Sequence, residues 1–431
     1  MPEIDRRLAG GSRNSSTDRR PKGRVILLVA TVLTLSLLLG AFSLMSRTDS
    51  SSWNPSMPVG IAYVTHAPIT IEGDAGFLAD NSSTGISWGS GTVSDPYLIE
   101  GWDIAGVDDY SRAAIRIGGS TVHFVIQGCE VHDAYGDFKY GIFLQGCTNA
   151  TIRDSILYNN NYAILLENDH DDERPSNHQV INNTCTDNVY GIMVNHVRGS
   201  EVSNNTCRNN QIGILYASTL YDQVVNNTCI DNVCGLELAI VEGDEVAGNN
   251  CSSNSGAGIF VFKASGTTLR NNTCSNNGLG MQFGEADWEG GSDDNLIQSN
   301  WIEDNTAYGI AMGAGNQNNL IWNNSFVGNN GAGAAYDPER AQAVDNGSAN
   351  WWNTTDGYGN YWSDWTSPDE NLDEIVDSPY QVNGTAEAMD YYPKASAPEE
   401  IPEFSSSIIL VTVLIATIGI LAMARRPRDG R

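Results

Sequence analysis

A repeat of about 22 residues organises the middle of this 431-residue chain. Its most visible mark is the tetrapeptide NNTC, which occurs four times, with a near-copy, GNNC, before the last of them. Steps of 22 or 23 residues separate the members of its cysteine column, which are Cys185, Cys207, Cys229, Cys251 and Cys274. Ile302 and Phe326 continue the column without a thiol and Leu157 precedes it, so the shared property is an apolar side chain.

Two columns of asparagine accompany the apolar column. The first lies two residues before it and consists of Asn183, Asn205, Asn227, Asn249, Asn272, Asn300 and Asn324. The second lies three residues after it and consists of Asn188, Asn210, Asn232, Asn254, Asn277, Asn305 and Asn329. An aliphatic residue precedes each apolar position by five, and a glycine follows it by six or seven. Each unit therefore holds three short apolar patches separated by asparagine or glycine corners.

This pattern predicts a stack of short strands. The unit is too short for a pair of helices and shows no 3.6-residue periodicity, which excludes helical repeats. Three strands of about four residues, each closed by a tight turn, fit it. Asparagine tolerates left-handed turns and can hydrogen-bond to a stacked neighbour. We predict an all-β, right-handed parallel β-helix, a pectate-lyase-like solenoid of about nine or ten coils over residues 97–345.

The repeating cysteines are interpreted as core residues. Cysteine packs as a small buried hydrophobe. Parallel side chains on stacked coils oppose the roughly 90° torsion of a disulfide. We predict free, buried thiols, with an occasional stacked disulfide as the alternative.

Two apolar segments bracket the repeats. Residues 25–45 follow a basic tail (1–24) and are long enough to cross a hydrocarbon core of about 30 Å. Residues 407–424 precede a second basic tail (425–431). We predict N- and C-terminal transmembrane helices, the first a signal anchor, with both termini cytoplasmic and the intervening domain outside the cell membrane. That domain comprises a linker (46–57), an N-terminal cap segment (58–96), the repeats, a closing module (346–393) and a linker (394–406).

The exported domain is strongly acidic. Between the two tails the chain carries 48 acidic and 11 basic residues, within a formal net charge of -29 for the whole. Such a surface repels nucleic acid and attracts cations. We therefore expect no nucleic-acid partner, although solubility alone also explains the charge.

Several segments resemble known families. The repeats, together with GSGTVSDPYLIEGWDI (89–104) and the stretch from GNYWSDW to DYYP (359–393), resemble the NosD-type β-helix family, in particular archaeal surface-protein members. The tripeptide at 402–404, followed by an apolar run and a basic tail, resembles the PEF-type sorting signal of archaeal surface proteins. These resemblances imply an archaeosortase-type processing enzyme and an association with copper. They indicate fold more strongly than activity.

The closing module contains a candidate ion site. Asp369, Asn371, Asp373 and Asp377 have the alternating, then wider, spacing of D-x-N-x-D calcium loops. The positions that hold glycine and the last glutamate in an EF-hand differ here, so a full EF-hand is not expected. We predict a calcium-binding loop, with a plain acidic turn as the alternative.

Six aromatic residues lie near this loop. They are Trp351, Trp352, Tyr358, Tyr361, Trp362 and Trp365. Such a cluster favours a cap over the open end of the solenoid core. A platform on which sugar rings stack is the alternative.

One strand face can be checked for catalytic groups. If Ile192 and Val194 point inward, Met193 points outward. Its equivalents in other repeats are Phe143, Leu165, Leu215, Glu237, Phe260, Gln282 and Ala311. Only one is acidic, so we predict no catalytic cluster of the kind that β-helix hydrolases and lyases need.

Metal and modification sites complete the candidates. His123 and His178 are too far apart in the stack to share one copper ion, whereas His170 and His178 flank one insert.

The N-x-S/T signals within the repeats coincide with turns. The glycosylation candidates outside the repeats are Asn81, Asn346, Asn353 and Asn383.

We therefore expect a membrane-anchored, non-enzymatic cell-surface protein that binds glycans, cations or surface-layer proteins. One alternative is a polysaccharide lyase or glycoside hydrolase. A second is a NosD-type copper-binding accessory protein. No cofactor is required by these expectations, apart from possible calcium.

Overall fold

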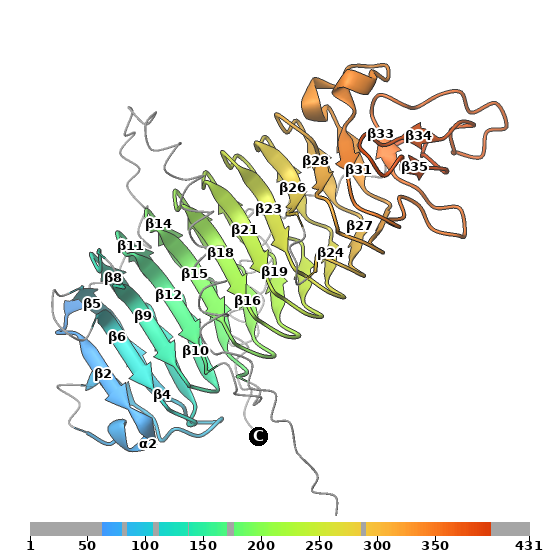
Figure 1. The fold of residues 1–431 in the computed structure, drawn as a ribbon. Helices are drawn as coiled ribbons and strands as arrows, with labels where there is room; N and C mark the ends of the chain where they lie inside the picture. Colours follow the sequence, from blue (N-terminus) through green and yellow to red (C-terminus); the bar gives the residue numbers. More distant parts are fainter. Residues whose placement is uncertain are drawn as a thin grey trace, which may run out of the picture. The chain divides into compact units, whose positions relative to one another are not determined.

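The computed structural model describes residues 63–79, 84–106, 112–136, 138–169, 176–285 and 290–397. Within them, successive strands stack side by side along one solenoid (Figure 1). These residues contain no helix that is both long and apolar enough to span a membrane. The predicted segments 25–45 and 407–424 and the PEF-like motif lie outside the described residues.

Three parallel sheets form the walls of the solenoid, and we name each by its typical inward residue. The Val-sheet has 11 strands: β3 (Ile86–Trp88), β4 (Tyr97–Glu100), β7 (Phe124–Gln127), β10 (Ala150–Arg153), β13 (Gln179–Ile181), β16 (Glu201–Ser203), β19 (Gln223–Val225), β22 (Glu245–Ala247), β24 (Thr268–Arg270), β27 (Leu296–Gln298) and β30 (Leu320–Trp322). The Ile-sheet also has 11: β2 (Ile69–Glu72), β6 (Ala113–Gly118), β9 (Tyr140–Gln145), β12 (Tyr162–Glu167), β15 (Tyr190–Asn195), β18 (Ile212–Ala217), β21 (Cys234–Ala239), β23 (Ala257–Phe262), β26 (Leu279–Phe283), β29 (Ile310–Met312) and β32 (Ala343–Asp345).

The Cys-sheet is divided in two. Its first seven strands are β1 (Val64–Thr65), β5 (Trp102–Ala105), β8 (Glu130–His132), β11 (Ile156–Tyr158), β14 (Thr184–Thr186), β17 (Thr206–Arg208) and β20 (Thr228–Ile230). Its last four are β25 (Thr273–Ser275), β28 (Trp301–Glu303), β31 (Ser325–Val327) and β33 (Tyr361–Trp362). The break falls at GNNC, where Asn250 replaces the threonine of NNTC and joins its neighbours through isolated bridges only.

Within the described residues, few complete elements lie outside the three sheets. They are the short helices α2 (Gly73–Gly76), η2 (Asn329–Gly331) and η3 (Pro338–Arg340), and the strands β34 (Tyr380–Gln381) and β35 (Met389–Asp390). Strands β34 and β35 pair with each other antiparallel, as β3 does with β4. All other pairs among the described strands are parallel, which confirms the predicted parallel β-helix.

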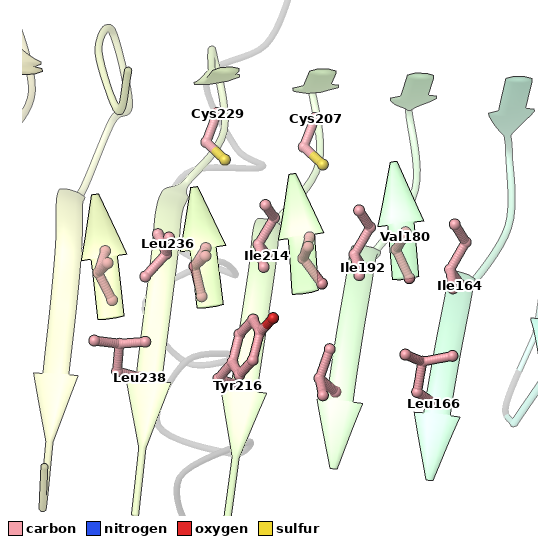
Figure 2. Close-up of a cluster of buried hydrophobic side chains, with 14 of the residues drawn as sticks. Ile164, Leu166, Val180, Ile192, Cys207, Ile214, Tyr216, Cys229, Leu236 and Leu238 are labelled. Carbon is pink, nitrogen blue, oxygen red and sulfur yellow. The ribbon is translucent and has the colours of Figure 1, made fainter. Parts of the chain in front are cut away.

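The register of the Cys-sheet follows the repeat. Cys185 pairs with Cys207, and Cys207 with Cys229. Cys274 pairs with Ile302, as its column predicts. All members of this column are fully buried, and Figure 2 shows two of the thiols pointing into the core beside the aliphatic residues of the other two sheets.

Close contact between coils explains the glycine column. A Cβ at Gly191 would lie 2.4 Å from the carbonyl oxygen of Gly213, and one at Gly213 would lie 2.5 Å from that of Gly235. Earlier coils hold alanine at the equivalent position, where Ala114 and Ala163 are fully buried. Glycine therefore allows the closest stacking at these positions, and a side chain larger than alanine would push neighbouring coils apart.

The two asparagines of NNTC have different roles. The first, as in Asn204, has a φ of 56° and forms the exposed left-handed corner. The second, as in Asn205, is buried and bonds to the next coil. The backbone N–H of Asn205 and its Nδ2 both donate to Oδ1 of Asn227, at 2.9 and 3.0 Å. The same Nδ2 also donates to the carbonyl oxygen of Val180 in the preceding coil, at 2.8 Å.

This link repeats along both asparagine columns and forms two ladders. The first ladder joins Asn183, Asn205, Asn227, Asn249, Asn272, Asn300, Asn324 and Asn360. The second joins Asn160, Asn188, Asn210, Asn232, Asn254, Asn277, Asn305 and Asn329. In each, the donors belong to one coil and the accepting oxygen to the next, so every ladder runs in one direction.

Both ladders end on a buried carboxylate. In the first, the backbone N–H of Asn360 donates to Oδ2 of Asp390, at 2.7 Å. In the second, Asn329 donates to Gln342, whose Nε2 donates to Oδ1 of Asp364 at 2.6 Å. A carboxylate suits these positions because it accepts hydrogen bonds and requires no further acceptor.

We predict that Asn227→Ala destabilises the solenoid by about 2–4 kcal/mol. The change leaves the buried backbone N–H of Asn205 without an acceptor and removes one of the acceptors of its Nδ2, and buried N–H groups are costly when unpaired. The shift of the urea-unfolding midpoint measures the effect. Asn204→Gly is the matched control, since glycine accepts the same left-handed corner. Equal midpoints for the two variants would contradict the ladder's role.

We also predict that native thiols resist modification. All eight cysteines are free, and only Cys234 is less than fully buried. Contact with the thiol of the preceding coil, together with burial, raises the pKa of Cys207 and Cys229. Alkylation followed by mass spectrometry should label at most Cys234 in the native protein and all eight cysteines in denaturant without reductant. Protection of any cysteine pair in denaturant would reveal a disulfide.

Candidate functional site

The outward face of the Ile-sheet has the register expected from the repeat. Leu165 pairs with both Phe143 and Met193, and Met193 pairs with Leu215. Glu237 follows Leu215 in the same row as its one acidic member. The row therefore lacks the paired carboxylates of a glycoside hydrolase.

The closing module covers the end of the core with stacked rings. Phe326 stacks on Trp362 with ring centroids 4.1 Å apart, and Trp362 stacks on Tyr380 at 3.9 Å. Trp352 and Trp362 are fully buried, and Nε1 of Trp362 donates to Oδ2 of Asp390 at 2.9 Å. These contacts support the cap interpretation for Trp352 and Trp362.

Other aromatic residues of this module face solvent. Trp351 is 58% exposed and Tyr358 is 57% exposed. Leu320 and Trp322 alternate outward on β30, and Trp351 lies opposite Leu320. The rings of Trp322 and Tyr358 are 6.1 Å apart. Tyr392 adjoins Gly357, the neighbour of Tyr358.

We call Trp322, Trp351, Tyr358 and Tyr392 the aromatic platform. It occupies the outer surface of the last Val-sheet strand and the closing module, away from the buried cap rings. Flat aromatic faces on a rigid sheet edge can stack against apolar faces of a ligand ring. Of the six aromatic residues noted in the sequence, Trp352 and Trp362 thus belong to the cap, and Trp351 and Tyr358 belong to the platform.

The acidic loop of the closing module is held by its own hydrogen bonds. Both Asp369 and Asn371 accept the backbone N–H of Asp373, at 3.2 and 3.0 Å. Asp377 accepts the N–H of Glu370 at 2.8 Å. These bonds describe a turn in which side-chain oxygens satisfy the backbone, and calcium binding by this loop stays a prediction.

A cluster on the Cys-sheet was not predicted from the sequence. Nε2 of His132 lies 2.9 Å from Oδ1 of Asp103, and its Nδ1 lies 2.9 Å from Oδ2 of Asp133. The imidazole stacks on Tyr158, with centroids 5.0 Å apart. The Tyr158 hydroxyl donates to Oε1 of Glu130 at 2.8 Å.

The environment of this cluster favours the protonated form of His132. Partial burial alone would lower the pKa of His132, but the hydrogen bonds to Asp133 and Asp103 outweigh it and the pKa is raised. Burial, and then Glu130, raise the pKa of Tyr158. Both imidazole nitrogens are occupied by carboxylates, so the histidine is placed to brace β5, β8 and β11 more than to exchange protons with a substrate.

The sequence did contain a signal for the cluster. Asp103, His132 and Tyr158 each lie one residue from the apolar column, where alternation places side chains outward. The row of outward residues on the Ile-sheet does not include these positions, which lie on the Cys-sheet.

Copper requires imidazole or sulfur ligands that are accessible. His178 is 2% exposed, and its Nδ1 accepts the N–H of Ala150 at 3.3 Å. Across the described ranges, no three or more His, Cys, Asp or Glu side chains gather in a way that could hold a metal ion. The described residues thus show no such cluster for copper, and His170 lies outside them.

The glycosylation candidates differ in their surroundings. Oδ1 of Asn346 accepts the N–H of Thr385 at 3.1 Å, and Oδ1 of Asn353 accepts that of Tyr391 at 3.0 Å. Asn383 is exposed, with its Oδ1 bonded to the next residue's N–H. Asn81 lies outside the described residues. Glycosylation at these positions stays a prediction.

Solved structures similar to this chain share low sequence identity with it. The A-module of the Azotobacter vinelandii mannuronan C-5 epimerase AlgE6 has a TM-score of 0.43 and 16% identity, covering 68% of this chain and 86% of that one. A single-substitution mutant of the periplasmic alginate epimerase AlgG has a TM-score of 0.40 and 16% identity, covering 59% and 71%. The Dettilon tailspike protein has a TM-score of 0.38 and 14% identity, covering 57% of each.

Sequence comparisons identify the family. The probable ABC transporter binding protein NosD of Stutzerimonas stutzeri is 33% identical over 95 residues, which are 22% of this chain and 19% of that protein. The chain thus matches about a fifth of that relative's length. The model of the family described as periplasmic copper-binding protein (NosD) matches residues 108–249 and 173–367, more than half of the chain. The chain belongs to the NosD family.

Proposed function

We propose that this protein is a non-enzymatic glycan-binding solenoid at the cell surface. The observation that carries the proposal is the aromatic platform, where Trp351 and Tyr358 expose more than half of their surface and the Tyr358 ring lies 6.1 Å from that of Trp322. Large exposed aromatic residues cost solubility and mark interaction sites. Their position on a rigid sheet edge favours a ligand with repeating ring faces, such as a surface polysaccharide.

The charge of the protein favours a neutral glycan. The formal net charge is -29, which repels polyanions such as uronate polymers. Arginines on the strands are paired with acids: Arg208 lies 3.0 Å from Asp231, and Arg270 bonds to Glu245. An acidic polysaccharide would have to displace these carboxylates.

We further propose that the protein is held at the outer face of the cell membrane. The apolar segments 25–45 and 407–424, with their basic flanks, support this arrangement. The PEF-like tripeptide supports archaeosortase-type processing of the C-terminal segment. Surface-layer proteins and surface glycans would then be the accessible partners.

Substitutions in the platform test the binding proposal. We expect the full-length protein to bind neutral polysaccharides, such as soluble mannan or β-glucan, more tightly than polyuronate in isothermal titration. Trp351→Ala and Tyr358→Ala should each weaken binding about two- to tenfold, because an aromatic contact contributes about 0.5–1.5 kcal/mol. Tyr391→Ala is the matched control, since Tyr391 is 59% exposed but lies outside the platform. Unchanged affinity in the platform variants would overturn the proposal.

The enzymatic alternative predicts a different pattern. If the His132 cluster acted on a polysaccharide, wild-type protein would cleave or epimerise the polymer and His132→Asn would abolish that activity. We expect no turnover of these polymers by the wild type. We also expect His132→Asn to leave glycan affinity unchanged, because β8 lies at the opposite end of the strand order from the platform.

A further inference from the structure

A third ladder lies at the corner between the Ile-sheet and the Val-sheet. Its links run from the N–H of one coil to a side-chain acceptor of the next. The first four join Ala150, His178, Ser200, Asp222 and Asp244. Further along, the same corner links Thr267, Asn295, Asn319 and Asn350. Unlike the two asparagine ladders, this one contains residues that titrate.

The asparagine members show what this corner requires. Nδ2 of Asn295 donates to Oδ1 of Asn319 and to the carbonyl of Ala264, both at 2.9 Å. Nδ2 of Asn319 likewise donates to the carbonyl of Ser292 at 2.9 Å. The second atom of Asn295 and that of Asn319 thus face acceptors, so each of these two positions holds a donor.

Asp222 places an oxygen at this donor position. Its Oδ1 accepts the N–H of Ser200 at 2.6 Å, but its Oδ2 is buried and has no hydrogen-bond partner. The following member, Asp244, accepts the N–H of Asp222 at Oδ1 and the hydroxyl of Thr219 at Oδ2. Asp222 and Asp244 are each 1% exposed and lie on adjacent coils, about 4.8 Å apart.

The surroundings of this pair are acidic or neutral. Besides burial, the charge of Asp244 raises the pKa of Asp222. Besides burial, the charges of both aspartates raise the pKa of Tyr216, which Figure 2 shows inside the core. The charge of Glu201 also raises the pKa of Tyr216. Two ionised carboxylates stacked here would repel each other in a medium with few compensating charges.

We propose that a proton held by the Asp222–Asp244 pair completes the third ladder, and that its loss at alkaline pH loosens the joint between the coils of β18–β19 and β21–β22. A protonated Oδ2 of Asp222 supplies the donor that asparagine supplies elsewhere in the ladder. The joint is then a proton-sensitive element in the middle of the stack.

The titration behaviour agrees with this geometry. Burial raises the pKa of Asp222 to about 8 and that of Asp244 to about 6. An unfolded aspartate titrates near pH ~4. Between about pH 4 and pH 8 the folded pair therefore holds more protons than the unfolded chain. Its contribution to stability is complete below about pH 4 and is lost as the pH rises to about 8.

His178 contributes a slope of the opposite sign. Burial lowers the pKa of His178 to about 4, because its Nδ1 accepts the N–H of Ala150 and the neutral ring is required. Its contribution is present above about pH 6.5 and is lost as the pH falls towards about 4. The test therefore compares variants with wild type at each pH, so that the histidine's contribution cancels.

Denaturant unfolding of the full-length protein from pH 4 to pH 9 tests the proposal. Asp222→Asn supplies the missing donor, so at pH 8.5 its unfolding equilibrium constant should be at least tenfold smaller than that of the wild type. The difference should shrink or reverse at pH 4.5. Asp304→Asn, at an exposed left-handed corner, is the matched control and should follow the wild type throughout.

A second measurement does not depend on the variant's stability. In the wild type, amide exchange at Ser200 and Asp222, corrected for the intrinsic pH effect, should accelerate between pH 6 and pH 9, and in Asp222→Asn it should not. Infrared spectra at pH 7 should show a protonated buried carboxyl that is absent from the double variant Asp222→Asn/Asp244→Asn. Identical pH profiles for wild type and Asp222→Asn, or spectra without that band, would overturn the proposal.

Discussion

The hydrogen bond between stacked side-chain amides is the interaction on which this solenoid depends. Most strands have only three to six residues, so strand pairing alone gives each coil few bonds. The corners would leave backbone N–H groups buried without acceptors if the asparagine Oδ1 of the next coil were not in place. By accepting an N–H and an Nδ2–H together, one asparagine satisfies the corner before it, as Asn227 does for Asn205. The corners therefore join neighbouring coils together with the strands.

Much of this fold could be predicted from the sequence because the columns have one residue type each. Three columns show that the same environment recurs from coil to coil. They are the column of Asn183, the column of Cys185 and the column of glycine before the aliphatic residue. The third corner was not recognised, since His178, Ser200, Asp222 and Asn295 share an acceptor role without sharing a residue type. Residues that play the same role but differ in type form no recognisable column in a single sequence.

The candidate site was less predictable for a related reason. The aromatic residues of the closing module lie outside the repeat. No periodicity therefore indicated that Trp351 is exposed and Trp352 is buried. Their fates differ because one side chain points to solvent and the other donates its Nε1 to Asp345, at 2.9 Å. The His132 cluster depends on contacts between residues 28 or 29 positions apart in sequence, and strand alternation alone could locate its members only approximately.

The direction of the ladders has a consequence for how such a protein can change in length. The Oδ1 of every internal asparagine accepts hydrogen bonds from the coil before it, and its N–H groups donate to the coil after it. Coils with both asparagines are therefore equivalent as units of the two ladders. The ends of the ladders differ, because the carboxylates of Asp390 and Asp364 accept hydrogen bonds and donate none. Duplication or loss of an interior coil that carries both asparagines would preserve the bonds of the two asparagine ladders, whereas loss of the closing module would leave the last donor of each ladder without an acceptor. Such a solenoid can thus gain coils internally as long as the carboxylates of Asp364 and Asp390 are kept.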